Sequence, residues 1–137
     1  MVINTQALAW ANLAVQLVLF LVVLTAAYLA RKKKKFKAHC SIMRVAVPLQ
    51  LIIIAGAMLP SMVGLIERGQ SGWIFNTTML VHHSLGLAVV ILWVVINLLF
   101  MGIVKINMDI KILMRAAFFS WIMVLILGVF LFKGIWL

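Results

Sequence analysis

Four long apolar stretches dominate this sequence and restrict what the chain can fold into. They cover about residues 8–30, 45–66, 77–104 and 116–132. The hydrocarbon core of a bilayer is about 30 Å thick, and a helix needs about 20 residues to cross it. Helices satisfy their own backbone hydrogen bonds in lipid, which an open strand cannot do. We therefore predict an all-α integral membrane protein with four spans.

The composition agrees with a membrane protein and excludes a soluble domain. Of 137 residues, 67% are hydrophobic and 10% are charged, against about 45–50% and about 25% in soluble domains. A chain of this length cannot bury so much apolar surface by itself.

Short connections predict a single domain over residues 1–137, a four-helix antiparallel bundle. We expect the first stretch to be a permanent anchor, because a basic run follows it and nothing basic precedes it.

The distribution of basic residues predicts the orientation. Ten of the twelve Lys and Arg residues lie in or beside the first and third connections, which fall on one side of the membrane: Arg31, Lys32, Lys33, Lys34, Lys35, Lys37, Arg44, Lys105, Lys111 and Arg115. Arg68 and Lys133 lie on the other side. Basic loops stay cytoplasmic, so we predict a multi-pass plasma-membrane protein with both termini external. Trp10, Trp73 and Trp136 then fall near the outer interface.

The first connection is the most basic segment of the chain, with Arg31, Lys32, Lys33, Lys34, Lys35 and Lys37. We interpret it as a determinant of orientation that also attracts anionic lipid. The alternative is a docking site for an acidic partner. Nucleic acid is not an expected partner, because no stacking platform accompanies the charges.

Small and polar residues recur every seven positions in the two middle stretches. One stripe consists of Met43, Gln50, Ala57 and Gly64, and another of His83, Val90 and Asn97, with Gly86 close to it. Such residues mark the packed faces of membrane helices. We predict that the second and third spans meet along these faces, and that Pro60 kinks the second span.

Polar side chains within the spans are candidates for chemistry, because they are costly in lipid. No carboxylate lies inside a span, which argues against a proton pump or a carboxylate-driven transporter. No hydrolase or nucleotide-binding motif is present, so we do not expect catalysis by the chain alone. His82 and His83 are the main candidates. Adjacent helical positions point about 100° apart, and the stripe favours His83 as the inward one.

Methionines predicted at the same outer level suggest a metal or haem site beside these histidines. The proposed set is His83, His82, Met58, Met62 and Met79. Histidine and methionine are known axial haem ligands, so the set suits haem b, and thioethers suit copper as Cu(I). The alternative is that the methionines only fill the core and that the histidines are structural. His39 is predicted a bilayer away, so it cannot share a haem iron with them.

Two further features are minor. Cys40 is the single cysteine, so the chain has no internal disulfide. Asn76-Thr77-Thr78 matches an N-glycosylation acceptor in the predicted outer loop.

Several short motifs carry a resemblance over about the last hundred residues. They are Lys37-Ala38-His39-Cys40-Ser41-Ile42-Met43, Met58-Leu59-Pro60-Ser61, His83-Ser84-Leu85-Gly86, Met114-Arg115 and Trp121 through Leu127-Gly128. This pattern resembles small four-helix membrane proteins of uncharacterised function, some encoded near haem–copper oxidase components, and more distantly four-helix b-type cytochromes. The chain departs from those cytochromes, which supply paired histidines at both levels of the bundle.

The resemblance implies an accessory or structural subunit of a larger membrane redox complex, of the oxidase or monooxygenase type. Its expected partners are the lipid bilayer and other membrane subunits. The alternative is a small electron-transfer or metal-handling protein that binds haem or copper. A transporter is a third and weaker hypothesis, because the sequence shows no internal repeat.

Overall fold

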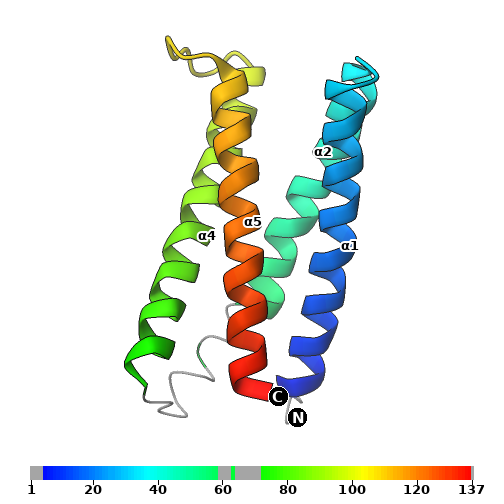
Figure 1. Cartoon of the computed structure of the whole chain (residues 1–137). Coiled ribbons are helices and arrows are strands. Elements are labelled where there is room, and N and C mark those ends of the chain that lie inside the picture. Colours follow the sequence, from blue (N-terminus) through cyan, green and yellow to red (C-terminus); the bar gives the residue numbers. More distant parts are fainter. Residues whose placement is uncertain (1–4, 59–62, 64–71, 137) are drawn as a thin grey trace. The chain divides into compact units, whose positions relative to one another are not determined.

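Four long helices make up the fold (Figure 1). The computed structural model describes residues 5–58, 63 and 72–136, without the side chains of residues 5, 57, 58 and 136. The elements are α1 (Thr5–Arg31), α2 (Phe36–Ile53), the π-helix η1 (Ile54–Met58), α4 (Trp73–Phe100) and α5 (Ile110–Trp136). The four long helices are each long and apolar enough to cross a membrane. The all-α prediction is therefore confirmed, with four candidate spans.

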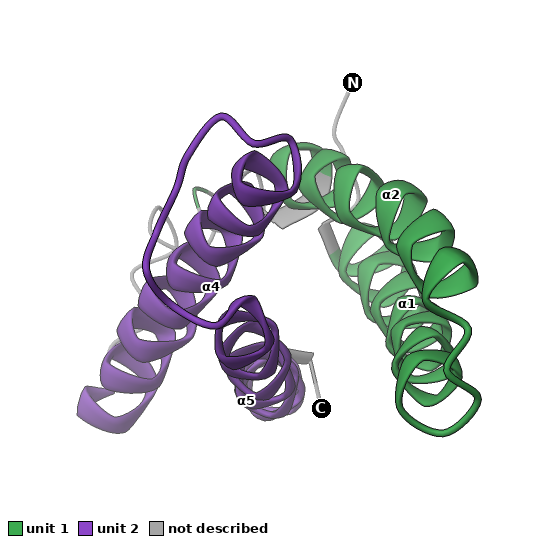
Figure 2. Ribbon diagram, turned by 90° about the horizontal axis from the view of Figure 1, so that it is seen from above, with its two compact units in different colours: residues 1–70 green, residues 71–137 purple. Residues whose placement is uncertain are grey.

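The chain divides into two compact units, residues 1–70 and 71–137 (Figure 2). In the first unit α1 packs against α2 and η1, and in the second α4 packs against α5. Each unit is a hairpin of two antiparallel helices joined by a short turn (Figure 1). The expected meeting of the second and third spans concerns helices of different units, so it stays a prediction.

The contact face of the first hairpin follows a regular spacing on α1. Its buried residues recur at intervals of three and four positions: Gln16, Leu19, Val23 and Ala26. This spacing keeps one face of a helix turned toward an antiparallel neighbour. On α2 the buried residues are Ala46, Val47 and Gln50. Ala26 has no exposed surface, and small side chains of this kind allow two membrane helices to pack closely.

The second hairpin uses a similar spacing on α5, where Ala117, Trp121, Val124 and Leu131 are buried. On α4 the buried residues are His82, Val89 and Trp93. The Trp93 and Trp121 rings meet edge to face, with 5.9 Å between centroids and 69° between planes, an arrangement that aromatic pairs favour.

Both ends of the α4–α5 turn are capped. Gly102 has φ +72°, and the N–H groups of Gly102 and Ile103 donate to the carbonyls of Leu99 and Leu98 at 3.1 Å. These two bonds define a Schellman motif, which needs a residue with positive φ. At the other end, Asp109 Oδ1 accepts a hydrogen bond of 2.9 Å from the N–H of Lys111. Asp109 is thus the N-cap of α5.

The second span differs from its predicted bounds. Helix α2 begins at Phe36, nine residues before the predicted start at residue 45. The basic residues Lys37 and Arg44 do not end the helix, because long basic side chains can extend from a helix end toward water. Pro48 lies inside α2, and the helix widens into η1. The kink predicted at Pro60 falls outside the described residues.

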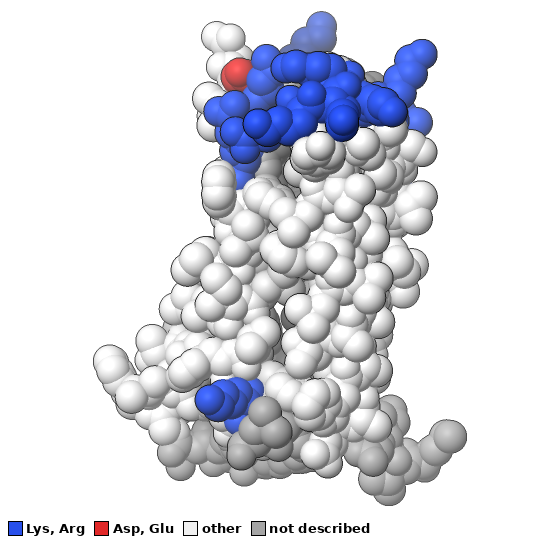
Figure 3. Space-filling model, turned by 45° about the vertical axis from the view of Figure 1, so that its right-hand side comes forward, with Lys and Arg blue, Asp and Glu red and all other residues white. Residues whose placement is uncertain are grey.

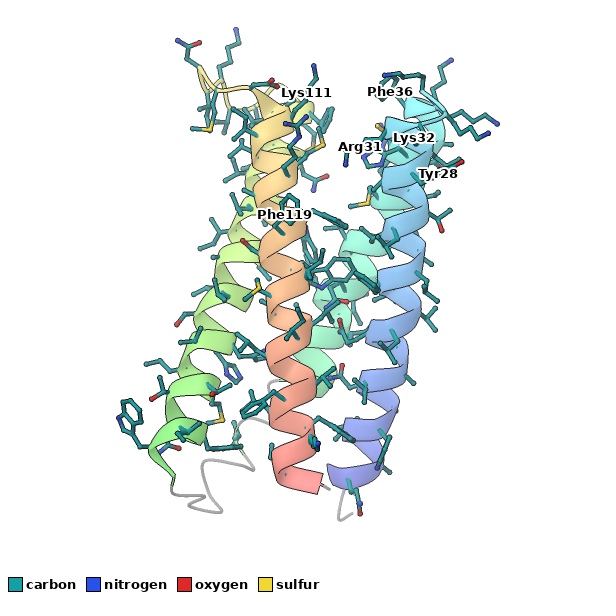
Figure 4. The ribbon with its side chains drawn as sticks, in the orientation of Figure 1. Tyr28, Arg31, Lys32, Phe36, Lys111 and Phe119 are labelled. Atoms are coloured by element: carbon teal, nitrogen blue, oxygen red, sulfur yellow. The ribbon has the colours of Figure 1, made fainter. Side chains whose placement is uncertain are left out.

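On the face that Figure 3 shows, most Lys and Arg side chains gather toward one end of the helices, and the described surface below them is largely free of charged residues. In the first hairpin, Arg31 and Lys32 lie at the turn that joins α1 to α2, and in the second Lys111 lies at the start of α5 (Figure 4). Large apolar side chains such as Leu17, Val18 and Leu21 are exposed on the wall of α1.

Candidate functional site

His82 connects the two helices of the second hairpin. Its side chain is 7% exposed, and its Nδ1 lies 3.0 Å from the backbone carbonyl oxygen of Val124 on α5. A carbonyl oxygen only accepts hydrogen bonds, so Nδ1 carries the proton and donates. In the neutral ring, Nε2 then keeps its lone pair.

Gly128 leaves room for the His82 ring. A Cβ atom built on Gly128 would lie 3.1 Å from His82 Cε1, closer than ordinary van der Waals contact. The residue stands one helical turn after Val124, whose carbonyl receives the His82 proton. The ring therefore lies against α5 at a position where a side chain would displace it.

His83 makes a different contact from its neighbour. Its Nδ1 donates to the carbonyl oxygen of Met79, one turn earlier on α4, at 2.7 Å. The ring is half-buried and meets the His82 ring edge to face, 5.2 Å away between centroids. We expected His83 to be the inward histidine. Within the α4–α5 hairpin that position belongs to His82, because the face toward α5 runs through residues 82, 89 and 93 instead of 83, 90 and 97.

The predicted metal or haem set is only partly described. The structure brings His82 and His83 together, with the backbone of Met79 bonded to His83. Met62 and the Met58 side chain lie outside the described residues. Among the residues that are described, no three His, Cys, Asp or Glu side chains gather as a metal site. Both rings do donate from Nδ1 to a carbonyl, as metal-bound histidines commonly do, so each Nε2 could bind a metal or haem iron.

A buried pair of amides lies between α1 and α2. Gln50 Nε2 donates to Gln16 Oε1 at 3.0 Å, and the two side chains are 4% and 5% exposed. The other two amide atoms, Gln16 Nε2 and Gln50 Oε1, are buried without a partner. Both residues lie roughly 20 Å along their helices from the connecting turn, at 1.5 Å per residue, so in a membrane this pair would lie near mid-bilayer.

The third histidine links the same two helices near their turn. His39 Nδ1 donates to the carbonyl oxygen of Ala26 on α1 at 3.0 Å. Each hairpin therefore has a histidine on one helix that donates to a backbone carbonyl of the other.

The remaining predicted packing residues have varied positions. A Cβ added to Gly86 would meet no atom within 4 Å, so α5 does not require glycine there. Asn97 donates to the Trp93 carbonyl on its own helix at 2.8 Å. The backbone of Ala57 belongs to η1, while Pro60 and Gly64 lie outside the described residues.

The predicted basic loop forms the α1–α2 turn. Its six basic side chains are all exposed: Arg31, Lys32, Lys33, Lys34, Lys35 and Lys37. Lys34 has φ +56°, a left-handed conformation that is costly for a residue with a Cβ. The N–H of Lys35 donates back to the Leu29 carbonyl at 3.0 Å.

The glycosylation motif is helical in the structure. Asn76 lies in the first turn of α4, where its N–H donates to the Gly72 carbonyl at 2.9 Å. Thr78 donates its hydroxyl to the Ile74 carbonyl at 2.8 Å.

The role of Gly128 and the Trp93–Trp121 pair were not predicted from the sequence. The spacing of Ala117, Trp121, Val124, Gly128 and Leu131, at intervals of four and three, is the signal that could have found them.

Comparison of the chain with family models, curated proteins and solved structures finds no match.

Proposed function

We propose that this protein is a multi-pass accessory subunit of a larger membrane redox complex, of the oxidase or monooxygenase type. The observation that carries the structural role is the use of the polar side chains. His82, His39 and Gln50 each form a hydrogen bond to the partner helix of their own hairpin. Such bonds hold membrane helices together, so these three side chains support a structural role.

The outward faces of the helices support lateral association. Large apolar side chains are exposed along α1, α4 and α5, among them Leu21, Leu87 and Ile126, which are 63%, 62% and 57% exposed. Such faces suit lipid or the apolar helices of another subunit. The redox assignment itself rests on the resemblance carried by the motifs around His39, Met58 and His83.

Co-purification tests this function. The tagged chain would be isolated from its native membrane in a mild detergent, and the co-purifying proteins identified by mass spectrometry. We expect subunits of a membrane oxidase or monooxygenase in constant ratio to the tagged chain. A chain that purifies alone, while unrelated membrane complexes in the same extract stay intact, would contradict the accessory role.

A haem- or copper-binding carrier is the second candidate. The supporting observation is that His82 and His83 both donate from Nδ1, which leaves Nε2 as the ligand atom. Optical spectra and metal analysis of the purified chain test it. A Soret band or stoichiometric copper, lost in His83→Ala or His82→Ala and retained in His39→Ala, would favour the carrier. A clean apoprotein that co-purifies with oxidase subunits would favour the accessory role.

A further inference from the structure

The α1–α2 turn concentrates positive charge without a balancing acid. Six basic side chains are exposed between Arg31 and Lys37. The nearest acidic residue in the sequence is Glu67, thirty positions after Lys37. Helix α2 starts with no acidic residue in its first turn and no side-chain hydrogen bond from its N-cap, Lys35. The described residues of the first hairpin therefore include no acidic side chain that could neutralise these charges.

The α4–α5 turn of the second hairpin differs in this respect. It has three basic residues in or beside it, Lys105, Lys111 and Arg115. It also contains Asp109, whose carboxylate caps α5 through the N–H of Lys111. Both turns are basic, so both are expected to be cytoplasmic. They differ in local charge, because only the α4–α5 turn contains an acidic residue.

Two exposed aromatic side chains flank the basic turn. Tyr28 is 53% exposed and precedes it, and Phe36 is 60% exposed and opens α2 (Figure 4). Tyrosine is enriched where helices leave the hydrocarbon region for the headgroup region. The basic side chains between Tyr28 and Phe36 would then lie at the height of lipid phosphates.

We propose that the α1–α2 turn binds the phosphate headgroups of anionic phospholipids, and that its preference for them exceeds that of the α4–α5 turn. The inference rests on the insertion of α1 and α2 in a bilayer, as the proposed function requires. Lipid is favoured over an acidic protein because the charges stand directly at the ends of two apolar helices. A lysine near an anionic membrane surface contributes about 1 kcal/mol, which corresponds to about fivefold in affinity.

The single cysteine offers a direct probe of this site. Cys40 is partly accessible and lies about one helical turn after Phe36. The full chain, labelled at Cys40 with a fluorophore, would be reconstituted in vesicles containing brominated phosphatidylglycerol or brominated phosphatidylcholine at equal mole fraction. Bromine quenches the label on contact, so the two quenching curves give the relative association constant of the anionic lipid.

Two triple variants provide the comparison. The test variant is Lys32→Gln, Lys33→Gln and Lys35→Gln, which leaves the unusual backbone of Lys34 intact. The control variant is Lys105→Gln, Lys111→Gln and Arg115→Gln, which removes the same charge from the other turn. We expect the unchanged chain to prefer phosphatidylglycerol by about fivefold or more. The preference should fall at least about fivefold in the test variant, which keeps Arg31, Lys34 and Lys37, and persist in the control.

Other outcomes would overturn the inference. Equal quenching by both lipids in the unchanged chain would show that the protein does not prefer the anionic lipid. An equal loss of preference in both triple variants would show that the preference depends on the net charge of the protein and not on the α1–α2 turn. Displacement of phosphatidylglycerol by inorganic phosphate at constant ionic strength would show that the turn binds a free anion instead of a lipid headgroup. Binding of polyglutamate that phosphatidylglycerol does not displace would assign it to an acidic protein. Absence of quenching by either lipid would count against membrane insertion itself, and so against the proposed function.

Discussion

Gly128 controls how closely His82 can approach α5. An alanine there would place its Cβ 3.1 Å from His82 Cε1, so the ring would have to move by a few tenths of an ångström. The hydrogen bond from His82 Nδ1 to the Val124 carbonyl would weaken. Overpacking and a weakened interhelical bond together outweigh the higher helix propensity of alanine, so we predict that Gly128→Ala destabilises the hairpin by about 1 kcal/mol net. Thermal unfolding in detergent, followed by circular dichroism, would measure it.

Gly134 on the same helix is the matched control for this prediction. A Cβ added there meets no atom within 4 Å. Since alanine is favoured over glycine inside a helix by up to about 1 kcal/mol, Gly134→Ala should be neutral or stabilising. Equal losses in Gly128→Ala and Gly134→Ala would show that the His82 contact is not the cause.

Lys34 stores local strain in the α1–α2 turn. Its φ of +56° costs a residue with a Cβ roughly 1 kcal/mol compared with glycine. We predict that Lys34→Gly raises the stability of the first hairpin by up to about 1 kcal/mol. Lys33→Gly removes the same charge at a position without positive φ, so it should bring no such gain. The difference in unfolding temperature between these two variants checks the prediction.

The pairing of α1 and α2 depends on the buried amides of Gln16 and Gln50. Replacing either glutamine by leucine removes the hydrogen bond and leaves the opposite amide with all its polar atoms unpaired. We predict that each single change costs about 1 kcal/mol, and that the double change costs less than their sum. A double-mutant cycle should give a coupling of about 0.6–2 kcal/mol. Gln6→Leu, at an exposed position of α1, is the control and should be nearly neutral.

Additive losses in that cycle would contradict the prediction, because independent effects would mean that the two amides do not interact. Unfolding in a mixed detergent series gives the free energies for all four proteins. The same series measured on Gln6→Leu separates loss of the amide pair from a general gain in apolar character.

The number and type of the elements follow from the sequence, because a span of about 20 apolar residues has few alternatives in lipid. Helix bounds are less well determined. The start of α2 at Phe36 was missed since charged residues near an interface end the apolar stretch but not the helix. The π-helix at Ile54–Met58 has no signature in hydropathy, because its apolar residues would suit an α-helix equally well.

The contact face of α4 shows why site geometry is harder to predict than helix number. The stripes through residues 82 and 83 both recur at seven positions, and they lie only about 100° apart. The choice between them depends on the partner helix, where Gly128 leaves space for a ring and Val124 offers a carbonyl. Both features belong to α5, so the pattern of residues within α4 alone does not predict which histidine faces α5.

At the scale of the whole molecule, both hairpins contain a hydrogen bond from a histidine to a backbone carbonyl of the partner helix, but at different distances from the turn. His39 is near the turn of the first hairpin and donates to Ala26, whereas His82 is far from the turn of the second and donates to Val124. Each bond joins a side chain to a backbone carbonyl that also belongs to a helix. A carbonyl oxygen has two lone pairs, so it can accept this additional hydrogen bond and keep the one within its own helix. Each hairpin therefore gains an interhelical hydrogen bond without losing a backbone one.

The distribution of charge predicts one orientation for the whole chain. Ten basic residues lie in or beside the two turns in the sequence, and the other two, Arg68 and Lys133, lie outside these segments. Both turns should therefore be cytoplasmic and both termini external. In a Cys40→Ser background, single cysteines at Lys33, Met108, Gln6 and Thr77 test this with a membrane-impermeant thiol reagent on intact cells. Gln6→Cys and Thr77→Cys should react, while Lys33→Cys and Met108→Cys should react only after the membrane is opened. Labelling of the Lys33 or Met108 site in intact cells would reverse the topology, and with it the leaflet in which the α1–α2 turn meets anionic lipid.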